Sequence, residues 1–218
     1  MSGIQLFAVT GAHGHRGLFG PGVEVVAFRD LAALVVEAPG SEAGVGLRVY
    51  REVVESVFRE QAVLPAPPGV IFRDRGVLAQ WMELHYFTLL DALAYVEDRA
   101  VARVAVAVAD PPPAVPLPPG NGTAGGNGEG EGEAEGRREE SEAVLRDVLR
   151  VLRRHAVATL PIGGDGGRVA AASFLVERAR WEVFAEVVAE ESDRLTDHAL
   201  RLTGPWPPYD FVRMQFTN

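Results

Sequence analysis

The side chains best suited to chemistry are five histidines, and two of them share one short loop. His13 and His15 lie in the glycine-rich run Gly11–Gly17, where two imidazoles can in principle hold a metal ion. A stable metal site needs further ligands, and none stands at a recognisable spacing in the sequence. We therefore interpret this run as a polar loop and predict no metal site.

The other three histidines fall on or beside predicted helices and strands. His85 lies on the apolar face of a predicted helix, where a hydrogen-bonded core histidine is more common than a catalytic base. His155 and His198 stand near the ends of predicted elements, where we expect them to bond to free backbone carbonyls. The serines occur in no nucleophile-elbow pattern, so we predict no catalytic triad.

Two further clusters resemble binding motifs without completing them. Gly163–Gly167 follows a predicted strand, but it lacks the lysine and hydroxyl residue of a P-loop and leads into another strand. Glu190, Glu191 and Asp193 are crowded at a predicted helix end, where acidic side chains usually face water. We expect no catalytic residue, no cofactor and no enzymatic activity in this chain.

Composition narrows the class of protein. The 218 residues are 47% hydrophobic, enough for one or two globular cores. No apolar run approaches the about 18–20 residues of a membrane-spanning helix. A net charge of −9 without a basic face argues against a nucleic-acid partner. The amino end lacks a secretory signal and the chain has no cysteine, so we expect a cytoplasmic location.

A low-complexity segment divides the sequence. From Asp110 the chain runs through a proline-rich stretch into a tract of glycine and glutamate that ends near Gly136. Such a segment cannot bury enough apolar surface to offset its ordering entropy, so residues 110–138 are predicted to be a disordered linker. The alternative is an acidic docking tail. The predicted domains are residues 1–109 and residues 139–218.

The first domain is predicted to be an α+β sandwich with helices on one side of a mixed sheet. Short runs rich in branched and aromatic residues predict strands over Ile4–Thr10, Val23–Phe28 and Leu31–Glu37. Apolar residues recurring at three and four predict amphipathic helices over Leu47–Ala62 and Arg75–Asp98. Branched residues alternating over Ala102–Val108 predict a further strand.

The second domain is predicted to be a smaller α+β unit. Apolar periodicity predicts helices over residues 144–155 and Glu177–Ser192. Paired strands are expected over Ala156–Ile162 and Arg168–Val176, joined by the glycine-rich turn. The chain is expected to end in two extended segments, Ala199–Thr203 and Tyr209–Phe216.

One stretch asks for a specific explanation, the proline-flanked aromatic run from Leu202 to Val212. Its prolines hold the backbone extended, so Trp206, Tyr209 and Phe211 offer rigid contact area at little entropic cost. The run can plug the core of its own domain, or it can present a surface to a partner. Both roles can hold together, with one aromatic ring buried and another presented.

This run, Leu-Thr-Gly-Pro-Trp-Pro-Pro-Tyr followed by Asp-Phe-Val, closely resembles the carboxy-terminal signature of the gas vesicle GvpF/GvpL family. Val63–Phe72 is similar to a second family stretch, with Pro67 and Pro68 where relatives usually have arginine and phenylalanine. Ala171–Val176 looks like a third, a strand of small residues followed by an aromatic, leucine and valine. Tyr50 stands where many relatives have a histidine.

The resemblance implies a two-domain protein, the first domain ferredoxin-like, that contacts the hydrophobic shell protein and other accessory proteins during gas vesicle assembly. It implies no cofactor and a gas-vesicle-associated location. We hypothesise that Trp206, Tyr209 and Phe211 make part of the partner contact. The alternatives are a small-molecule or metal-binding domain or enzyme on the same fold, or an assembly factor for another protein compartment.

Overall fold

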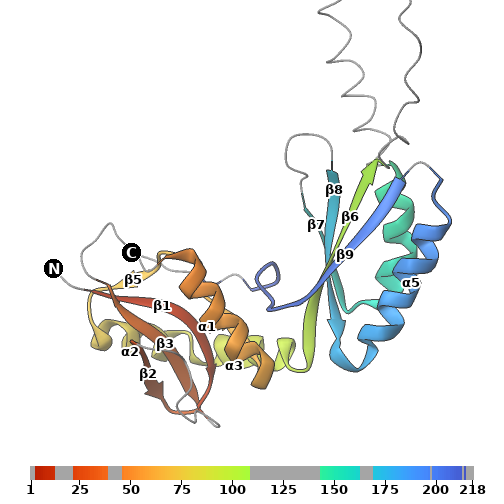
Figure 1. The fold of residues 1–218 in the computed structure, drawn as a ribbon. Coiled ribbons are helices and arrows are strands. Elements are labelled where there is room, and N and C mark those ends of the chain that lie inside the picture. The colour runs from red at the N-terminus through yellow and green to blue at the C-terminus, as the bar shows by residue number, and fades with distance from the viewer. Residues whose placement is uncertain are drawn as a thin grey trace, which may run out of the picture. The chain divides into compact units, whose positions relative to one another are not determined.

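The computed structural model describes residues 3–12, 22–38, 46–108, 143–162, 169–196, 198–212 and 214. The chain packs as two compact units, the first of Met1–Val101 with Pro205–Asn218 and the second of Ala102–Gly204. Each unit contains one sheet and helices, so the predicted α+β class is confirmed (Figure 1). The predicted linker over residues 110–138 and the turn at Gly163–Gly167 lie outside the described residues.

The sheet of the first unit has the strand order β2-β3-β1-β4, with β5 also paired to β1. Its pairings are antiparallel. Its strands are β1 (Gly3–Gly11), β2 (Val23–Phe28), β3 (Leu31–Ala38), β4 (Val63–Pro65) and β5 (Ile71–Phe72). The first three are the predicted strands. The other two have only three and two residues, too few to show an alternating pattern in the sequence.

Helices cover both faces of this sheet, whereas one face was predicted. On one face, α1 (Leu47–Glu60) brings the Tyr50 ring edge-on to Phe7 of β1, with 5.6 Å between ring centroids. On the other face, α2 (Arg75–Leu84) and α3 (Tyr86–Val96) pack on β1 and β3 (Figure 1). Neighbouring residues of a strand point to opposite faces, so β1 serves both layers. The single helix predicted here is two helices, broken at His85.

The second unit has the sheet order β7-β8-β6-β9. Its described strands and helices follow one another as β6 (Arg99–Val108), a helix over residues 143–152, β7 (Ala158–Ile162), β8 (Val169–Glu177), α5 (Trp181–Asp193) and β9 (His198–Trp206). This β-α-β-β-α-β succession is that of ferredoxin-like folds. The resemblance placed it in the first domain, but there three strands precede the first helix. The ferredoxin-like detail is therefore not confirmed for the first unit.

The two units also divide the chain at points that differ from the predicted boundaries. Strand β6 was predicted to close the first domain, yet it pairs in the second sheet. There Val104 and Val106 are buried in one cluster with Phe174 and Phe184. At the other boundary, Pro205–Asn218 belongs to the first unit. The alternating residues of β6 predict a strand, but they do not predict which sheet it joins, because that depends on residues far away in the sequence.

The carboxy-terminal segment folds back on the first unit through a turn, where an extended segment was predicted. The amide of Tyr209 donates to the Pro207 carbonyl at 2.7 Å, and the amide of Val212 donates to the Pro208 carbonyl at 3.2 Å. Val212 and Met214 then pack against the first core. Gly204, where the segment begins, has φ of 129°, a backbone conformation that residues with a side chain rarely adopt.

Tyr50 is where α1, the chain after β4 and the returning segment meet. Its side chain is 3% exposed, and its hydroxyl donates to the Ala66 carbonyl at 2.6 Å. The Tyr209 ring lies 6.3 Å from the Tyr50 ring, centroid to centroid. Burial, and to a lesser extent Tyr209, raises the pKa of the Tyr50 hydroxyl well above its usual range.

Tyr50→Phe is expected to lower the free energy of unfolding by about 1–3 kcal/mol, because it leaves the buried Ala66 carbonyl without its donor. Urea unfolding of both proteins measures this cost. Tyr95→Phe is the matched control, since Tyr95 is 43% exposed, and its effect should stay within about 0.5 kcal/mol. Equal effects of the two variants would contradict the role of Tyr50.

The raised pKa of Tyr50 also predicts a pH dependence. The unfolded chain ionises Tyr50 near its ordinary pKa of 10.0, while the folded chain keeps it protonated. The contribution of Tyr50 to the free energy of unfolding is therefore fully present below about pH 10. Above that pH it falls by up to about 1.4 kcal/mol per pH unit. The stability gap between wild type and Tyr50→Phe should shrink as the pH rises from about 9 to about 11. A gap that stays constant would show that Tyr50 ionises normally.

Candidate functional site

The aromatic segment, Pro205–Val212, is the candidate contact site predicted from the sequence. Pro207 and Pro208 are buried against the first unit, while Trp206, Tyr209 and Phe211 are each half-buried. The prolines fix the backbone, and the turn bonds of Tyr209 and Val212 hold it further. The segment therefore offers aromatic area in a conformation that has little freedom left to lose on binding.

The two roles considered for this segment fall on different residues. Tyr209 lies against the Tyr50 ring inside the first unit, which accords with plugging a core. That core belongs to the first unit, whereas the plugging role had been assigned to the segment's own, second domain. Trp206 and Phe211 keep part of their surface open to solvent, so both remain candidates for a partner contact.

Two of the three sequence segments that carry the family resemblance meet at Tyr50, which the sequence did not indicate. Ala66, whose carbonyl Tyr50 contacts, lies within the family-like stretch Val63–Phe72, and Tyr209 lies in the carboxy-terminal signature. Tyr50 is also one of the apolar residues whose spacing predicts the helix over Leu47–Ala62. Its place in the apolar stripe of α1, with Val53 and Val57, was the available signal that it is buried.

The histidines do not assemble into one site in the described part of the chain. His13 and His15 lie outside the described residues. His85 is half-buried at the break between α2 and α3, with its ring 5.2 Å from the Trp81 ring. His155 Nδ1 and His198 Nε2 are buried without a hydrogen-bond partner among the described residues, so these atoms do not make the predicted carbonyl bonds.

In the acidic cluster at the end of α5, two of the three side chains face water, whereas the Glu191 side chain is only 13% exposed. Glu190 and Asp193 are exposed, and Glu191 pairs with Arg194 at 2.7 Å. Across the residues that the structure describes, no group of three or more His, Cys, Asp or Glu side chains is arranged to hold a metal ion. None of the helices in those residues is long and apolar enough to cross a membrane.

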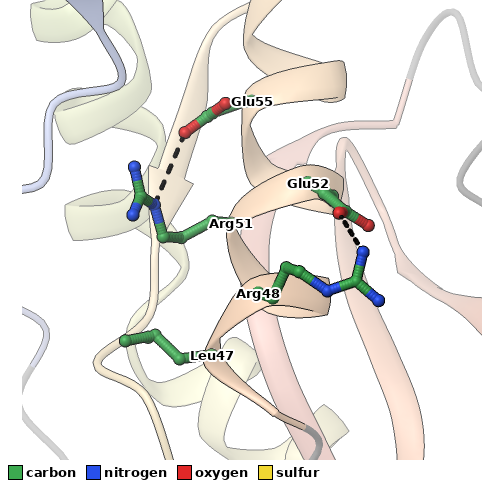
Figure 2. A pocket seen from close by; sticks show the side chains of 5 residues that line it. All are labelled: Leu47, Arg48, Arg51, Glu52 and Glu55. Atoms are coloured by element: carbon green, nitrogen blue, oxygen red, sulfur yellow. Dashed lines mark hydrogen bonds and ion pairs between the residues drawn. The ribbon is translucent and has the colours of Figure 1, made fainter.

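A hollow of about 440 Å³ lies over the first half of α1. Figure 2 shows its five lining side chains, Leu47, Arg48, Arg51, Glu52 and Glu55. Arg48 pairs with Glu52 at 2.9 Å, and Arg51 pairs with Glu55 at 3.7 Å. Each charge is thus matched by a neighbour one helical turn away, and such exposed pairs contribute a few tenths of a kcal/mol, about 0.3–0.5. The hollow gathers no unbalanced charge for a ligand.

A second surface was missed by sequence reasoning. The outward side of α2 and α3 carries Leu84, Phe87, Asp91, Ala94 and Tyr95, which we call the α2–α3 outer face. Leu84 is 78% exposed and Phe87 is 76% exposed, more than the other large exposed hydrophobic residues of the described chain. The apolar pattern of these helices predicts the stripe that faces the core. The exposed apolar residues on the opposite side of the same helices form a second, weaker stripe that the pattern did not single out.

Comparison with known proteins places this architecture. The family model of the gas vesicle synthesis protein GvpL/GvpF matches residues 3–213. No curated protein matches the chain.

Two crystal structures of gas vesicle protein GvpF are similar to the whole chain. The one from Anabaena sp. PCC7120 has a TM-score of 0.76 and 14% sequence identity, covering 99% of this chain and 100% of that one. The one from Microcystis aeruginosa has a TM-score of 0.72 and 12% identity, covering 97% of this chain and 99% of that one. At 14% and 12% identity, the similarity of the two structures to this chain is evidence for the fold alone. Because the family model spans nearly every residue, the resemblance is confirmed, and this chain belongs to the GvpL/GvpF family of gas vesicle synthesis proteins.

Proposed function

We propose that this chain is an accessory protein of gas vesicle assembly that works by binding the hydrophobic shell protein and other accessory proteins rather than by catalysis. Its family and the two GvpF structures support the link to gas vesicles. In this proposal the protein acts in the cytoplasm and associates with the growing vesicle. It keeps apolar partner surfaces from aggregating until they are incorporated.

The aromatic segment is the observation that carries this proposal. A partner rich in apolar surface is bound most efficiently by large, rigid aromatic side chains, because they bury area without losing many rotamers. Trp206 and Phe211 satisfy this condition, since the turn and the buried Pro207 and Pro208 hold them in place. Tyr209 anchors the same segment through its contact with Tyr50.

The proposal separates residues that hold the segment from residues that bind. A change at Tyr209 removes part of the packing around Tyr50, so it would weaken the fold and the contact together. A change at Trp206 or Phe211 acts on a half-buried ring that keeps part of its surface open to solvent. Trp206 is therefore the better position for a binding test.

Trp206→Ala is expected to weaken binding of the purified chain to the shell protein of the same organism by about thirtyfold, which corresponds to the loss of about 2 kcal/mol typical of a central aromatic contact. Pull-down and titration measure the affinity, and urea unfolding checks the fold. Leu47→Ala is the matched control, since Leu47 is 59% exposed on α1, and it should bind as wild type does. Unchanged binding by a folded Trp206→Ala protein would remove Trp206 from the contact.

Deleting the gene tests the wider role. Cells without this chain are expected to make few or no gas vesicles and to lose buoyancy, and the wild-type gene should restore both. Electron microscopy and a flotation assay give the readout. Intact, buoyant vesicles in the deletion strain would overturn the proposed function.

A further inference from the structure

The α2–α3 outer face forms an apolar stripe on the two helices. Residues three, four and seven apart share one side of a helix, so Leu84, Phe87, Ala94 and Tyr95 lie along a common side. The break at His85 leaves helical hydrogen bonds on both sides of it. The His85 amide donates to the Trp81 carbonyl at 3.1 Å, and the Leu89 amide donates to the His85 carbonyl at 2.9 Å.

The exposure of this stripe is fixed by the core behind it. Leu78, Met82, Leu89 and Leu93 are buried in the first core from the opposite side of the same helices. Turning the helices to hide Phe87 would bring these four side chains into water, at a larger loss of buried area. The outer face is thus a settled feature of the fold.

Phe87 is also held from the side. Its ring packs on the Tyr86 ring at 5.3 Å, and the Tyr86 hydroxyl donates to the Asp30 carboxylate in the β2–β3 turn. The Arg29 guanidinium lies over the Tyr86 ring at 5.2 Å and over the Phe28 ring at 5.3 Å. An exposed aromatic ring beside a fixed tyrosine and arginine has the composition of an interface hot spot.

The charges around the stripe indicate the kind of partner. On these helices every charged residue between Arg75 and Arg99 is acidic, and Glu83, Asp91, Glu97 and Asp98 are all exposed. From the β2–β3 turn, Arg29 adds a positive charge over the Tyr86 ring. Arg99 itself lies over the Tyr95 ring at 4.9 Å. A second copy of this chain would set carboxylates against carboxylates, which like-charge repulsion opposes. A surface with basic side chains beside an apolar stripe would be complementary.

We infer that the α2–α3 outer face docks an amphipathic helix of another gas vesicle protein, a helix whose apolar stripe covers Leu84, Phe87 and Tyr95. A basic residue beside that stripe faces Glu83, and one within it faces Asp91, which lies one helical turn from both Phe87 and Tyr95. A helix suits this face because side-chain ridges on one helix fit the grooves of another. The inference rests on the proposed function and adds to it a second surface, apart from the aromatic segment, with a partner of stated chemistry.

Photo-crosslinking in cells that make gas vesicles identifies what covers this face. Phe87 is replaced by p-benzoylphenylalanine, a close relative of the native side chain, and Leu47 is replaced in the same way as the control. The expected product joins position 87 to a basic amphipathic helix of a gas vesicle protein, and position 47 does not give it. Cross-links to a second copy, to residues 102–204 of the same chain or to an acidic segment would overturn the inference, and so would no cross-link.

Binding measurements then test the chemistry. With the cross-linked protein as partner, Phe87→Glu and Asp91→Arg are each expected to weaken binding at least tenfold, and wild-type binding should weaken as salt rises. Leu47→Glu, another apolar-to-acid change at an exposed site, should bind as wild type does. Salt-independent binding, or equal losses in Leu47→Glu, would overturn the basic-helix assignment.

Complementation separates this inference from the proposed function. If the deletion strain loses its vesicles and Phe87→Glu restores them fully, the outer face is not a docking site while the proposed function stands. If the deletion strain keeps its vesicles, both fail. If Phe87→Glu is folded yet does not restore vesicles, the outer face is needed for assembly.

Discussion

The hydroxyl of Tyr50 donates to the carbonyl of Ala66 in a place that is shielded from water, and the α1 side of the first unit is joined through that tyrosine. A buried carbonyl without a donor is costly, so the bond fixes where α1 lies relative to the chain that follows β4. The same tyrosine ring receives Phe7 from β1 and Tyr209 from the returning segment. One side chain thereby joins four parts of the sequence that are far apart.

This constraint explains the composition of the carboxy-terminal signature. Gly204 takes a positive φ that a residue with a side chain would resist. Pro207 and Pro208 are buried and limit the backbone, and their carbonyls accept the turn bonds from Tyr209 and Val212. The residues with these tasks are set by the fold alone. Trp206 and Phe211 are half-buried, so part of each ring stays open to solvent.

The sequence was informative where a feature is local. The strands Val23–Phe28 and Leu31–Glu37 were predicted from short runs rich in branched residues, and the helix α1 from its apolar period, and all three are present. The pairing of β6 was not predicted, because alternating valines fit any sheet that offers a partner. The turn after Pro208 was missed for a related reason, since proline suggests extended backbone until a long-range contact such as Tyr209 on Tyr50 bends it.

The two candidate contact surfaces also differ in how far the sequence could predict them. Trp206 could be noticed in the sequence because a tryptophan among prolines is unusual. Phe87 could not, because in the sequence it is one apolar residue among many in a helix whose other side forms the core. Only the burial of Leu89 and Leu93 shows which apolar residues of α3 remain outside. Because the core already holds α3 from its other side, Phe87 is not needed for packing there, and together with Leu84 and Tyr95 it forms the exposed apolar patch that we propose as a contact surface.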